Sequence, residues 1–149
     1  MLVIRSAGPD DVAALRAIAA AAYQKYVARI GQAPAPMTAD YAQAVRDGQV
    51  WAAVDDGEIA GFVVLVPEPG YLLLENVAVQ PAAQGRGIGA RLLTRAEDHA
   101  RDLGLSEIRR YTNEAMTENL TYYARRGYAE THRAEQDGFR RVFFRKPVR

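Results

Sequence analysis

The apolar residues in the first third of the chain recur every three or four positions, which predicts helices. Pro9-Asp10-Asp11 is expected to begin a long helix, since proline and acidic residues favour the first helical turn. Two prolines interrupt the pattern within residues 33–37, which are expected to form a loop and not a helix. Thr38 is the expected N-cap of a second, shorter helix. The predicted elements are a strand at residues 2–5, a helix from 9 to as far as 31, a loop at 33–37 and a helix from 38 to near 48.

From residue 50 the apolar positions alternate or run together, which is typical of strands, and two helical patterns separate the later strands. Asp55-Asp56-Gly57 and Asp137-Gly138 are turn sequences, and Pro67-Glu68-Pro69-Gly70 is expected to end a strand. Thr117 is the expected cap of the last helix. The predicted strands are residues 50–54, 59–66, 71–80, 107–112, 128–134 and 139–146, and the predicted helices are residues 88–104 and 117–126.

These elements follow the order β-α-α-β-β-β-α-β-α-β-β. Hairpins require antiparallel strand pairs, whereas strand–helix–strand crossovers give parallel pairs. The order therefore predicts an α/β fold with a mixed sheet of about seven strands and four helices. The length suits a single domain, residues 1–149. The hairpin in the first half argues against a doubly wound nucleotide-binding domain.

The composition limits the possible functions. The net charge is +1 and the basic residues are spread along the chain, which gives no reason to expect nucleic acid binding. No apolar run approaches the roughly 20 residues that cross a bilayer, and no signal peptide pattern is present, so no membrane association is expected. The absence of cysteine excludes disulfides and a cysteine acyl-enzyme and fits a cytoplasmic protein. His99 and His132 lack the spacing of metal ligands, so no metal is expected.

The most informative segment is Gln84-Gly85-Arg86-Gly87-Ile88-Gly89, which joins a predicted strand to a predicted helix. The first turn of a helix has free backbone N–H groups and carries partial positive charge from the helix dipole. Glycine has no Cβ and lets the backbone approach a ligand closely. Because helix starts of this kind bind anions, the segment predicts a phosphate-bearing ligand.

Two common phosphate-binding motifs fit this segment poorly. A P-loop requires Lys followed by Ser or Thr, and this segment has neither. Gly85, Gly87 and Ala90 match a dinucleotide-binding pattern, but that motif places an acidic residue at the end of the next strand. Here Glu107 lies near the start of the next predicted strand. A nucleotide-dependent enzyme of this type is therefore the less favoured alternative.

A third pattern fits better. Residues 84–89 have the form Q-x-x-G-x-G after a strand that ends in V-A-V-x-P, and residues 119–128 have the form N…Y-x-x-x-G-[FY]. In this order and separation, the segments resemble the GNAT superfamily of N-acetyltransferases, over roughly residues 70–130. The resemblance implies a three-layer fold whose fourth and fifth strands splay apart around the co-substrate acetyl-CoA.

The resemblance also implies how coenzyme A is held. Backbone N–H groups of residues 84–89 would bind its pyrophosphate, with Arg86 adding positive charge. Main-chain groups of Val77 and Val79 would pair with the pantetheine amides as an added strand does. The family usually has a β-bulge here, which turns backbone groups towards the thioester.

Two residues are candidates for proton transfer when an amine attacks the acetyl thioester. Tyr123 occupies the position of the family's general acid, four residues before the glycine, and would protonate the leaving thiolate. Tyr122 is expected to point about 100° away on the helix. Glu75 interrupts an apolar strand and is the candidate base, acting directly or through water. Alternatively, it is a surface residue paired with Arg109 or Arg110.

One position departs from the family pattern. Many family members carry Asn seven residues before this tyrosine, where this chain has Met116. Asn113 and Asn119 lie nearby and are the candidates for this cofactor contact. Asn119 precedes Tyr123 by four residues, so both are expected on one helix face.

The sequence does not identify the acceptor, which is expected to be a small-molecule or peptide amine. The first helices and the last hairpin are expected to shape its site, with Asp40 as a candidate partner for an ammonium group. Each of the residues expected to line this site is equally explained as a packing residue. The lining candidates are Tyr23, Tyr26, Pro34, Pro36, Met37, Asp40 and Tyr41.

A homodimer is expected, because relatives often dimerise and the final basic strand is a candidate exposed edge. The alternative function is a non-catalytic acyl-CoA-binding sensor on the same fold.

Overall fold

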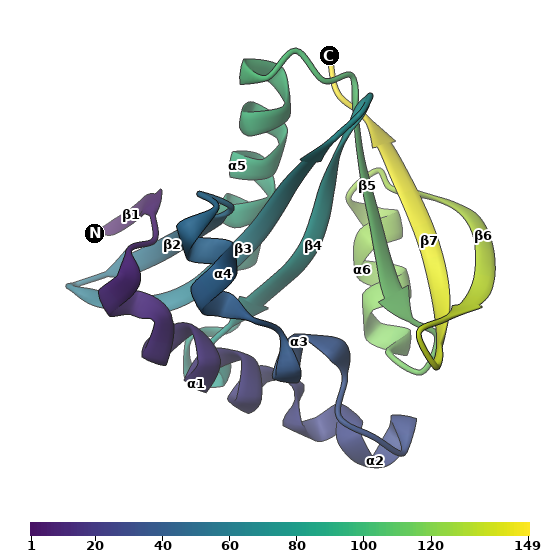
Figure 1. The fold of residues 1–149 in the computed structure, drawn as a ribbon, viewed down its shortest axis with the longest axis horizontal. Coiled ribbons are helices and arrows are strands. Elements are labelled where there is room, and N and C mark those ends of the chain that lie inside the picture. The colour runs from purple at the N-terminus through teal and green to yellow at the C-terminus, as the bar shows by residue number, and fades with distance from the viewer.

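A single mixed sheet with helices on both faces forms the structure, described over residues 1–149 by a computed structural model (Figure 1). The strands are β1 (Leu2–Ser6), β2 (Val50–Asp55), β3 (Glu58–Glu68), β4 (Tyr71–Val79), β5 (Glu107–Asn113), β6 (Ala129–Gln136) and β7 (Phe139–Pro147). The helices are α1 (Val12–Tyr23), α2 (Val27–Ile30), α3 (Ala35–Thr38), α4 (Tyr41–Arg46), α5 (Ile88–Asp102) and α6 (Thr117–Arg125). Short 3-10 turns lie at Pro9–Asp11, Gln24–Tyr26 and Pro81–Ala83. No helix is both long enough and apolar enough to cross a membrane.

The seven strands lie in the order β1-β2-β3-β4-β5-β7-β6. Every neighbouring pair is antiparallel except β4 and β5, which are parallel and are connected through α5. This confirms the predicted mixed α/β sheet. The prediction that the final strand is a sheet edge is wrong, because β7 pairs along its length with β5 on one side and β6 on the other. The exposed edge at this end of the sheet is β6.

Two apolar clusters lie on opposite faces of the sheet. Phe62 and Val64 belong to the cluster that contains α1 and α4, and Val63 and Leu65 belong to the cluster that contains α5. Consecutive residues of β3 join different clusters because successive side chains of a strand point to opposite faces. Tyr123 brings α6 into the α5 cluster. The sheet is therefore the middle of three layers.

The parallel strands β4 and β5 stay together only briefly. Residues 72–74 of β4 pair with residues 108–110 of β5, and no pairing continues beyond them. Figure 1 shows the two strands meeting at one end and diverging towards the other. From residue 75 to residue 79, β4 therefore has no strand neighbour on its β5 side.

A β-bulge occurs where the two strands separate. Val64 of β3 pairs with Asn76, and the next residue, Leu65, pairs with Leu74, so Glu75 is the extra residue. The bulge changes which side chains face which layer. Leu74 packs in the α5 cluster, whereas Ala78 packs in the α1 cluster although both are even-numbered. The extra residue thus turns Asn76 towards α1 and leaves Glu75 exposed at the opening.

The predicted loop at residues 33–37 is wrong in part, because Ala35–Thr38 forms the single-turn helix α3. Pro36 lies in its first turn, where a backbone N–H has no intrahelical partner to lose. The predicted cap at Thr38 is also wrong. Asp40 caps α4, since its Oδ1 accepts a hydrogen bond from the backbone N of Gln43 at 3.0 Å.

Other boundaries also differ from the prediction, and the long helix predicted from residue 9 is divided into α1 and α2 by the 3-10 turn Gln24–Tyr26. β3 runs through Pro67 to Glu68, because its last residues pair with the start of β4 and the proline lies near the strand end. Met116, and not Thr117, occupies the N-cap position of α6. Four helices are longer than four residues, as predicted; α2 and α3 are the additional single turns.

Candidate active site

An open groove, about 1140 Å³ with the solvent space at its mouth included, follows the free edge of β4. Its walls come from the end of α1, the loop before α5, the first turn of α5 and helix α6. Glu75, Arg86 and Asn113 lie outside this groove. The sequence-predicted site residues that line it are Val77, Val79, Gln84, Gly85, Gly87, Ile88, Gly89, Asn119 and Tyr123.

One end of the groove presents free backbone donors. None of the N–H groups of residues 85–90 has a hydrogen-bond partner within the protein, and the first bond of this turn is donated by the N–H of Arg91 to the carbonyl of Gly87. Gly85 and Gly87 have φ angles of 85° and 79°, in the left-handed region that favours glycine. Together with the dipole of α5, this loop is built to hold an anion.

The cations that line the groove differ from the predicted one, and one of them, Lys25, lies 4.0 Å from the carboxylate of Glu118, which also lines the groove. Arg86 is exposed and lies 3.9 Å from Asp55, so the structure directs it away from the groove. Lys25 and Arg126 line the groove instead. The guanidinium of Arg126 lies over the ring of Tyr122, 4.6 Å from its centroid. The sequence offered one signal for Arg126, its position directly before the glycine of the Y-x-x-x-G segment.

The free edge of β4 exposes main-chain groups of Val77 and Val79. The carbonyl of Val77 accepts from the Tyr23 hydroxyl at 2.9 Å, and that of Val79 accepts from Nε2 of Gln84 at 3.2 Å. Neither donor belongs to β3, so both carbonyls face the open side. In a strand, the N–H of a residue points to the same side as its carbonyl, so the N–H groups of both valines also face the groove.

Tyr123 lies at the inner end of the groove. The residue is only 2% exposed, its ring packs edge-to-face against Tyr122 and Tyr128, and its hydroxyl makes no hydrogen bond within the protein. Burial raises the pKa of Tyr123, and the charge of Arg110 acts in the opposite direction. The hydroxyl therefore keeps its proton at neutral pH.

Tyr122 does not point away from the site. It lines the groove with Tyr123, and its hydroxyl lies 3.1 Å from the position that a Cβ on Gly89 would occupy. Tyr122 and Tyr123 leave the helix in different directions, but both line the groove because the groove borders more than one face of α6. Tyr122 faces the anion-binding loop, whereas Tyr123 faces the splayed strands.

The two candidate asparagines lie in different places. Asn119 lines the groove, where its Nδ2 donates to Oγ1 of Thr112 at 3.2 Å and contacts Sδ of Met116 at 3.6 Å. Asn113 accepts from the backbone N of Ala115 at 2.9 Å and lines a second cavity. Only Asn119 is therefore placed to contact a ligand in the groove.

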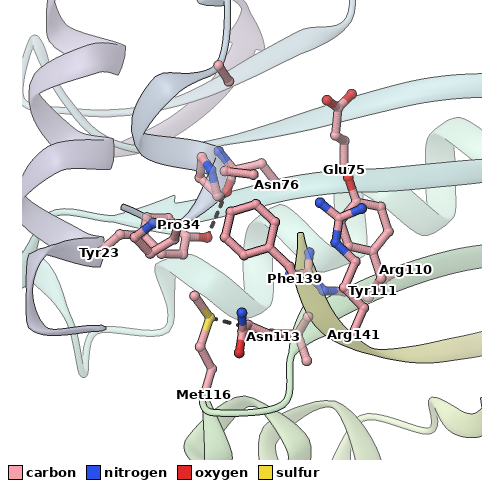
Figure 2. Close-up of a pocket in the computed structure, with 14 residues that line it drawn as sticks. Tyr23, Pro34, Glu75, Asn76, Arg110, Tyr111, Asn113, Met116, Phe139 and Arg141 are labelled. Carbon is pink, nitrogen blue, oxygen red and sulfur yellow. Dashed lines mark hydrogen bonds between the residues drawn. The ribbon is translucent and has the colours of Figure 1, made fainter. Parts of the chain in front are cut away.

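The second cavity, called the acceptor pocket below, lies on the other side of Tyr23, which lines both spaces, and measures about 560 Å³ with the open space at its mouth included. Figure 2 shows side chains from the α1 side, from the splayed strands and from β7 surrounding it. Of the lining candidates from the sequence, Tyr23, Pro34 and Pro36 are present here, and Tyr26 lines the groove instead. The pocket is lined by Tyr23, Pro34, Ala35, Pro36, Ala39, Glu75, Asn76, Arg110, Tyr111, Thr112, Asn113, Met116, Phe139 and Arg141.

A buried hydrogen-bond network fixes the wall between the two spaces. The Tyr23 hydroxyl donates to Oδ1 of Asn76 at 2.7 Å, and Nδ2 of Asn76 donates to the Tyr41 hydroxyl at 2.7 Å, which in turn donates to the carbonyl of Pro36. Asn76 was not predicted as a site residue from the sequence. The sequence feature that could have indicated it is a polar amide within an otherwise apolar strand. Asp40 is engaged as a helix cap and does not line the acceptor pocket.

Glu75 stands at the rim of the acceptor pocket. Its carboxylate makes no ion pair or hydrogen bond within the protein, so pairing with Arg109 or Arg110 is not observed. Arg109 pairs with Glu107 instead, at 2.9 Å. Partial burial raises the pKa of Glu75, and the nearby charge of Glu68 adds to this shift. Figure 2 shows the carboxylate projecting away from the other labelled side chains.

These features define an α/β protein with a groove along a free strand edge that is suited to a phosphate-bearing ligand. The model described as the Acetyltransferase (GNAT) family matches residues 13–128, so the chain belongs to this family. The family predicted from the two sequence segments is thereby confirmed.

The similar proteins include two curated acetyltransferases. The chain is 37% identical over 70 residues to the IAA acetyltransferase of Azospirillum brasilense, covering 47% of this chain and 46% of that protein. It is 36% identical over 97 residues to the mycothiol acetyltransferase of Cellulomonas flavigena, covering 62% of this chain and 27% of that protein. The chain thus spans less than half the length of these relatives.

The fold as a whole is similar to that of solved acetyltransferases. The PaiA N-acetyltransferase from Thermoplasma acidophilum, crystallised in complex with coenzyme A, superposes with a TM-score of 0.83 and covers 99% of both chains. The sequence identity is 18%, so this likeness concerns the fold. It confirms the predicted three-layer fold with splayed strands.

Proposed function

We propose that the protein transfers an acetyl group from acetyl-CoA directly to an amine. The observation that carries this proposal is the groove, which combines an anion-binding helix start, free strand donors and a tyrosine hydroxyl in one space. The family membership and the coenzyme A complex of a protein with the same fold support acetyl-CoA as the co-substrate. The acceptor pocket on the other side of Tyr23 supplies a place for the amine.

Each part of the groove suits one part of acetyl-CoA. The N–H groups of residues 85–90 would bind the pyrophosphate, with Lys25 and Arg126 adding positive charge. The N–H groups of Val77 and Val79 would pair with the pantetheine as an added strand does. Asn119 lies farther along the groove, near Thr112. In this arrangement the acetyl group would point into the opening between β4 and β5.

The chemistry requires two proton transfers. The neutral amine attacks the carbonyl carbon of the thioester, and the amine proton passes to Glu75 directly or through water. The carbon–sulfur bond then breaks, and Tyr123 protonates the departing thiolate. Because the pKa of Tyr123 is raised, its phenol is protonated at neutral pH and can donate a proton to the thiolate that leaves beside it.

Binding and turnover test this proposal separately. Calorimetry should show binding of acetyl-CoA and coenzyme A but not of NAD. A panel of amines should release coenzyme A, which a thiol reagent detects without background because the chain has no cysteine. Binding without release for any amine would favour the acyl-CoA-binding sensor. NAD binding without coenzyme A binding would contradict the proposal.

Glu75→Gln should lower the rate by roughly 10²-fold and change its pH dependence. A base acts when it is deprotonated, so the rate of the parent should rise with pH through the pKa of Glu75, which lies above the ordinary value. The variant should lose this acidic limb while acetyl-CoA affinity is unchanged. The measurement is kcat against pH. Glu68→Gln, which removes the other carboxylate acting on Glu75, should keep the limb and shift it to lower pH.

We propose a homodimer that forms through the exposed edge strand β6. All eight residues of β6 are exposed, and an uncovered strand edge is prone to pair with another chain. Light scattering over a wide concentration range should give twice the mass of the chain, and a constant monomer mass would contradict the proposal.

A cytoplasmic location, suggested by the composition, stays a prediction that cell fractionation tests.

A further inference from the structure

Arg110 is a buried cation without an acidic partner. The residue is 5% exposed and forms no ion pair, and its Nε has no hydrogen-bond partner. Its one hydrogen bond is long, from Nη1 to the carbonyl of Leu74 at 3.4 Å. Burying a charge without a partner costs free energy, and arginines are rarely buried unless paired. Because Arg110 lines the acceptor pocket, a ligand anion in that pocket would supply the missing partner.

Arg141 provides a second guanidinium in the same pocket. The residue is 7% exposed, and its guanidinium lies 4.1 Å from the ring centroid of Tyr111 and 5.5 Å from that of Phe139. Nη1 donates to Oε1 of Gln136 at 2.6 Å and lies 3.5 Å from the exposed carboxylate of Asp137. The other two nitrogens make no hydrogen bond within the protein. The stacking holds the planar fork in place, which suits two-point recognition of a carboxylate.

The buried part of the acceptor pocket carries positive charge, from Arg110 and Arg141. Glu75 is the only carboxylate that lines it, and Glu75 is exposed at the rim. The remaining walls are largely apolar, with two prolines, two alanines, a methionine and a phenylalanine among them. The pocket therefore combines a buried site for an anion, an apolar space and an acidic rim.

The anion site lies next to the proposed reaction centre. The guanidinium carbon of Arg110 is 4.5 Å from the ring centroid of Tyr123. A carboxylate bound to Arg110 would thus lie close to the amine that attacks the thioester. If one acceptor molecule carries both groups, its amine and its carboxylate must be separated by few bonds. An α-amino acid meets this requirement, because both groups are attached to one carbon.

We propose that the acceptor is a free α-amino acid with an apolar side chain, whose carboxylate pairs with Arg110, while Arg141 adds positive charge to the same pocket. This inference rests on the proposed acetyl transfer. The acceptor nitrogen forms a bond to the acetyl carbon, the carbon–sulfur bond breaks, Glu75 takes the amine proton, and Tyr123 gives a proton to the thiolate. The products are an N-acetyl amino acid and coenzyme A. A polyamine would place cations beside two guanidinium groups, and a peptide N-terminus has an amide in place of the carboxylate.

Matched acceptors test the inference without any substitution. The value of kcat/KM is measured at saturating acetyl-CoA for L-leucine, L-methionine and L-phenylalanine, for their carboxamides, and for the amines that lack the carboxyl group. At least one amino acid should exceed both of its analogues by about 10²-fold or more, because each analogue leaves a buried guanidinium unpaired. If a carboxamide or amine is acetylated as well as the matching acid, acetyl transfer stands and the inference is overturned.

Two variants test the role of Arg110 in selectivity. Arg110→Gln should reduce the preference for L-leucine over L-leucinamide by about 10²-fold, because the glutamine offers no positive charge to the carboxylate. Arg109→Gln is the matched control, since its side chain is exposed, pairs with Glu107 and does not line the pocket. The control should retain the parental preference. A parental preference in Arg110→Gln would overturn the assignment.

A binding experiment separates this inference from the chemistry. L-leucine, L-methionine and L-phenylalanine are titrated into the coenzyme A-loaded protein by calorimetry, with their carboxamides as controls. Binding of an acid but not of its carboxamide would support the carboxylate site even if no acceptor were acetylated. The absence of acid binding, together with no preference for acids in turnover, would overturn the inference while leaving the coenzyme A site intact.

Discussion

Tyr123→Phe is expected to lower turnover by roughly 10²–10⁴-fold while acetyl-CoA affinity changes little. The substitution keeps the buried ring and its edge-to-face contacts but removes the only proton that the side chain can give. The hydroxyl makes no hydrogen bond within the protein, so its loss leaves no other group unpaired. The measurements are kcat under saturating acetyl-CoA and the Kd of acetyl-CoA by calorimetry.

Two neighbouring tyrosines give matched controls. Tyr128→Phe removes a buried hydroxyl that has no partner and does not line the groove, so turnover should stay near the parental value. Tyr122→Phe should change acetyl-CoA affinity more than kcat, because the Tyr122 hydroxyl lies beside Gly89 at the anion-binding loop. Parental turnover in Tyr123→Phe would show that Tyr123 is a packing residue. Loss of kcat in Tyr122→Phe would assign the acid to the other tyrosine.

Gly87→Val is expected to weaken coenzyme A binding by at least about 10²-fold. Gly87 is the N-cap of α5 with φ at 79°, and a residue with a Cβ in the left-handed region costs roughly 1–2 kcal/mol. A β-branched residue is especially disfavoured there, so the loop should rearrange and the free N–H groups should no longer converge on one anion. Calorimetry with coenzyme A and with acetyl-CoA measures the effect.

Gly104→Val separates loss of the site from loss of stability. Gly104 follows the other end of α5 with φ at 71°, and a Cβ at either glycine meets no atom within 4 Å. Both variants should therefore lose a similar amount of stability in thermal unfolding, but only Gly87→Val should lose coenzyme A binding. Equal affinity in the two variants would show that this helix start does not hold the pyrophosphate.

Local patterns in the sequence were sufficient for the order of elements and for one end of the site. Helical and strand periodicity depend on neighbouring residues, which explains why seven strands and the four longer helices could be predicted. The glycines of residues 84–89 indicate a backbone conformation that few other residues adopt, and that conformation is local as well. The role expected of Tyr123 came from the resemblance to the family, through its spacing to Gly127, which lies just beyond the C-cap of α6. Errors at α3 and at the caps arose because Pro36 and Asp40 are compatible with more than one local structure.

Other features depended on contacts between distant residues. The resemblance to a family implied a splay and a bulge, but the register of β3 against β4 placed the bulge at Glu75, and that register is set by packing on both faces. The same shift turned Asn76 towards Tyr23, 53 residues away in the chain.

By itself, the sequence determined an α/β chain with a glycine-rich loop between a strand and a helix, and a tyrosine at a fixed distance from a glycine. Only the tertiary structure decided that Arg110 of β5 and Arg141 of β7 share one pocket, because β7 pairs with β5 although residues 114–138 lie between the two strands. It also decided that neither Arg110 nor Glu75 has an ionic partner. Strand patterns show which side chains are buried, but the identity of their neighbours follows from strand order and splay, which no local pattern contains.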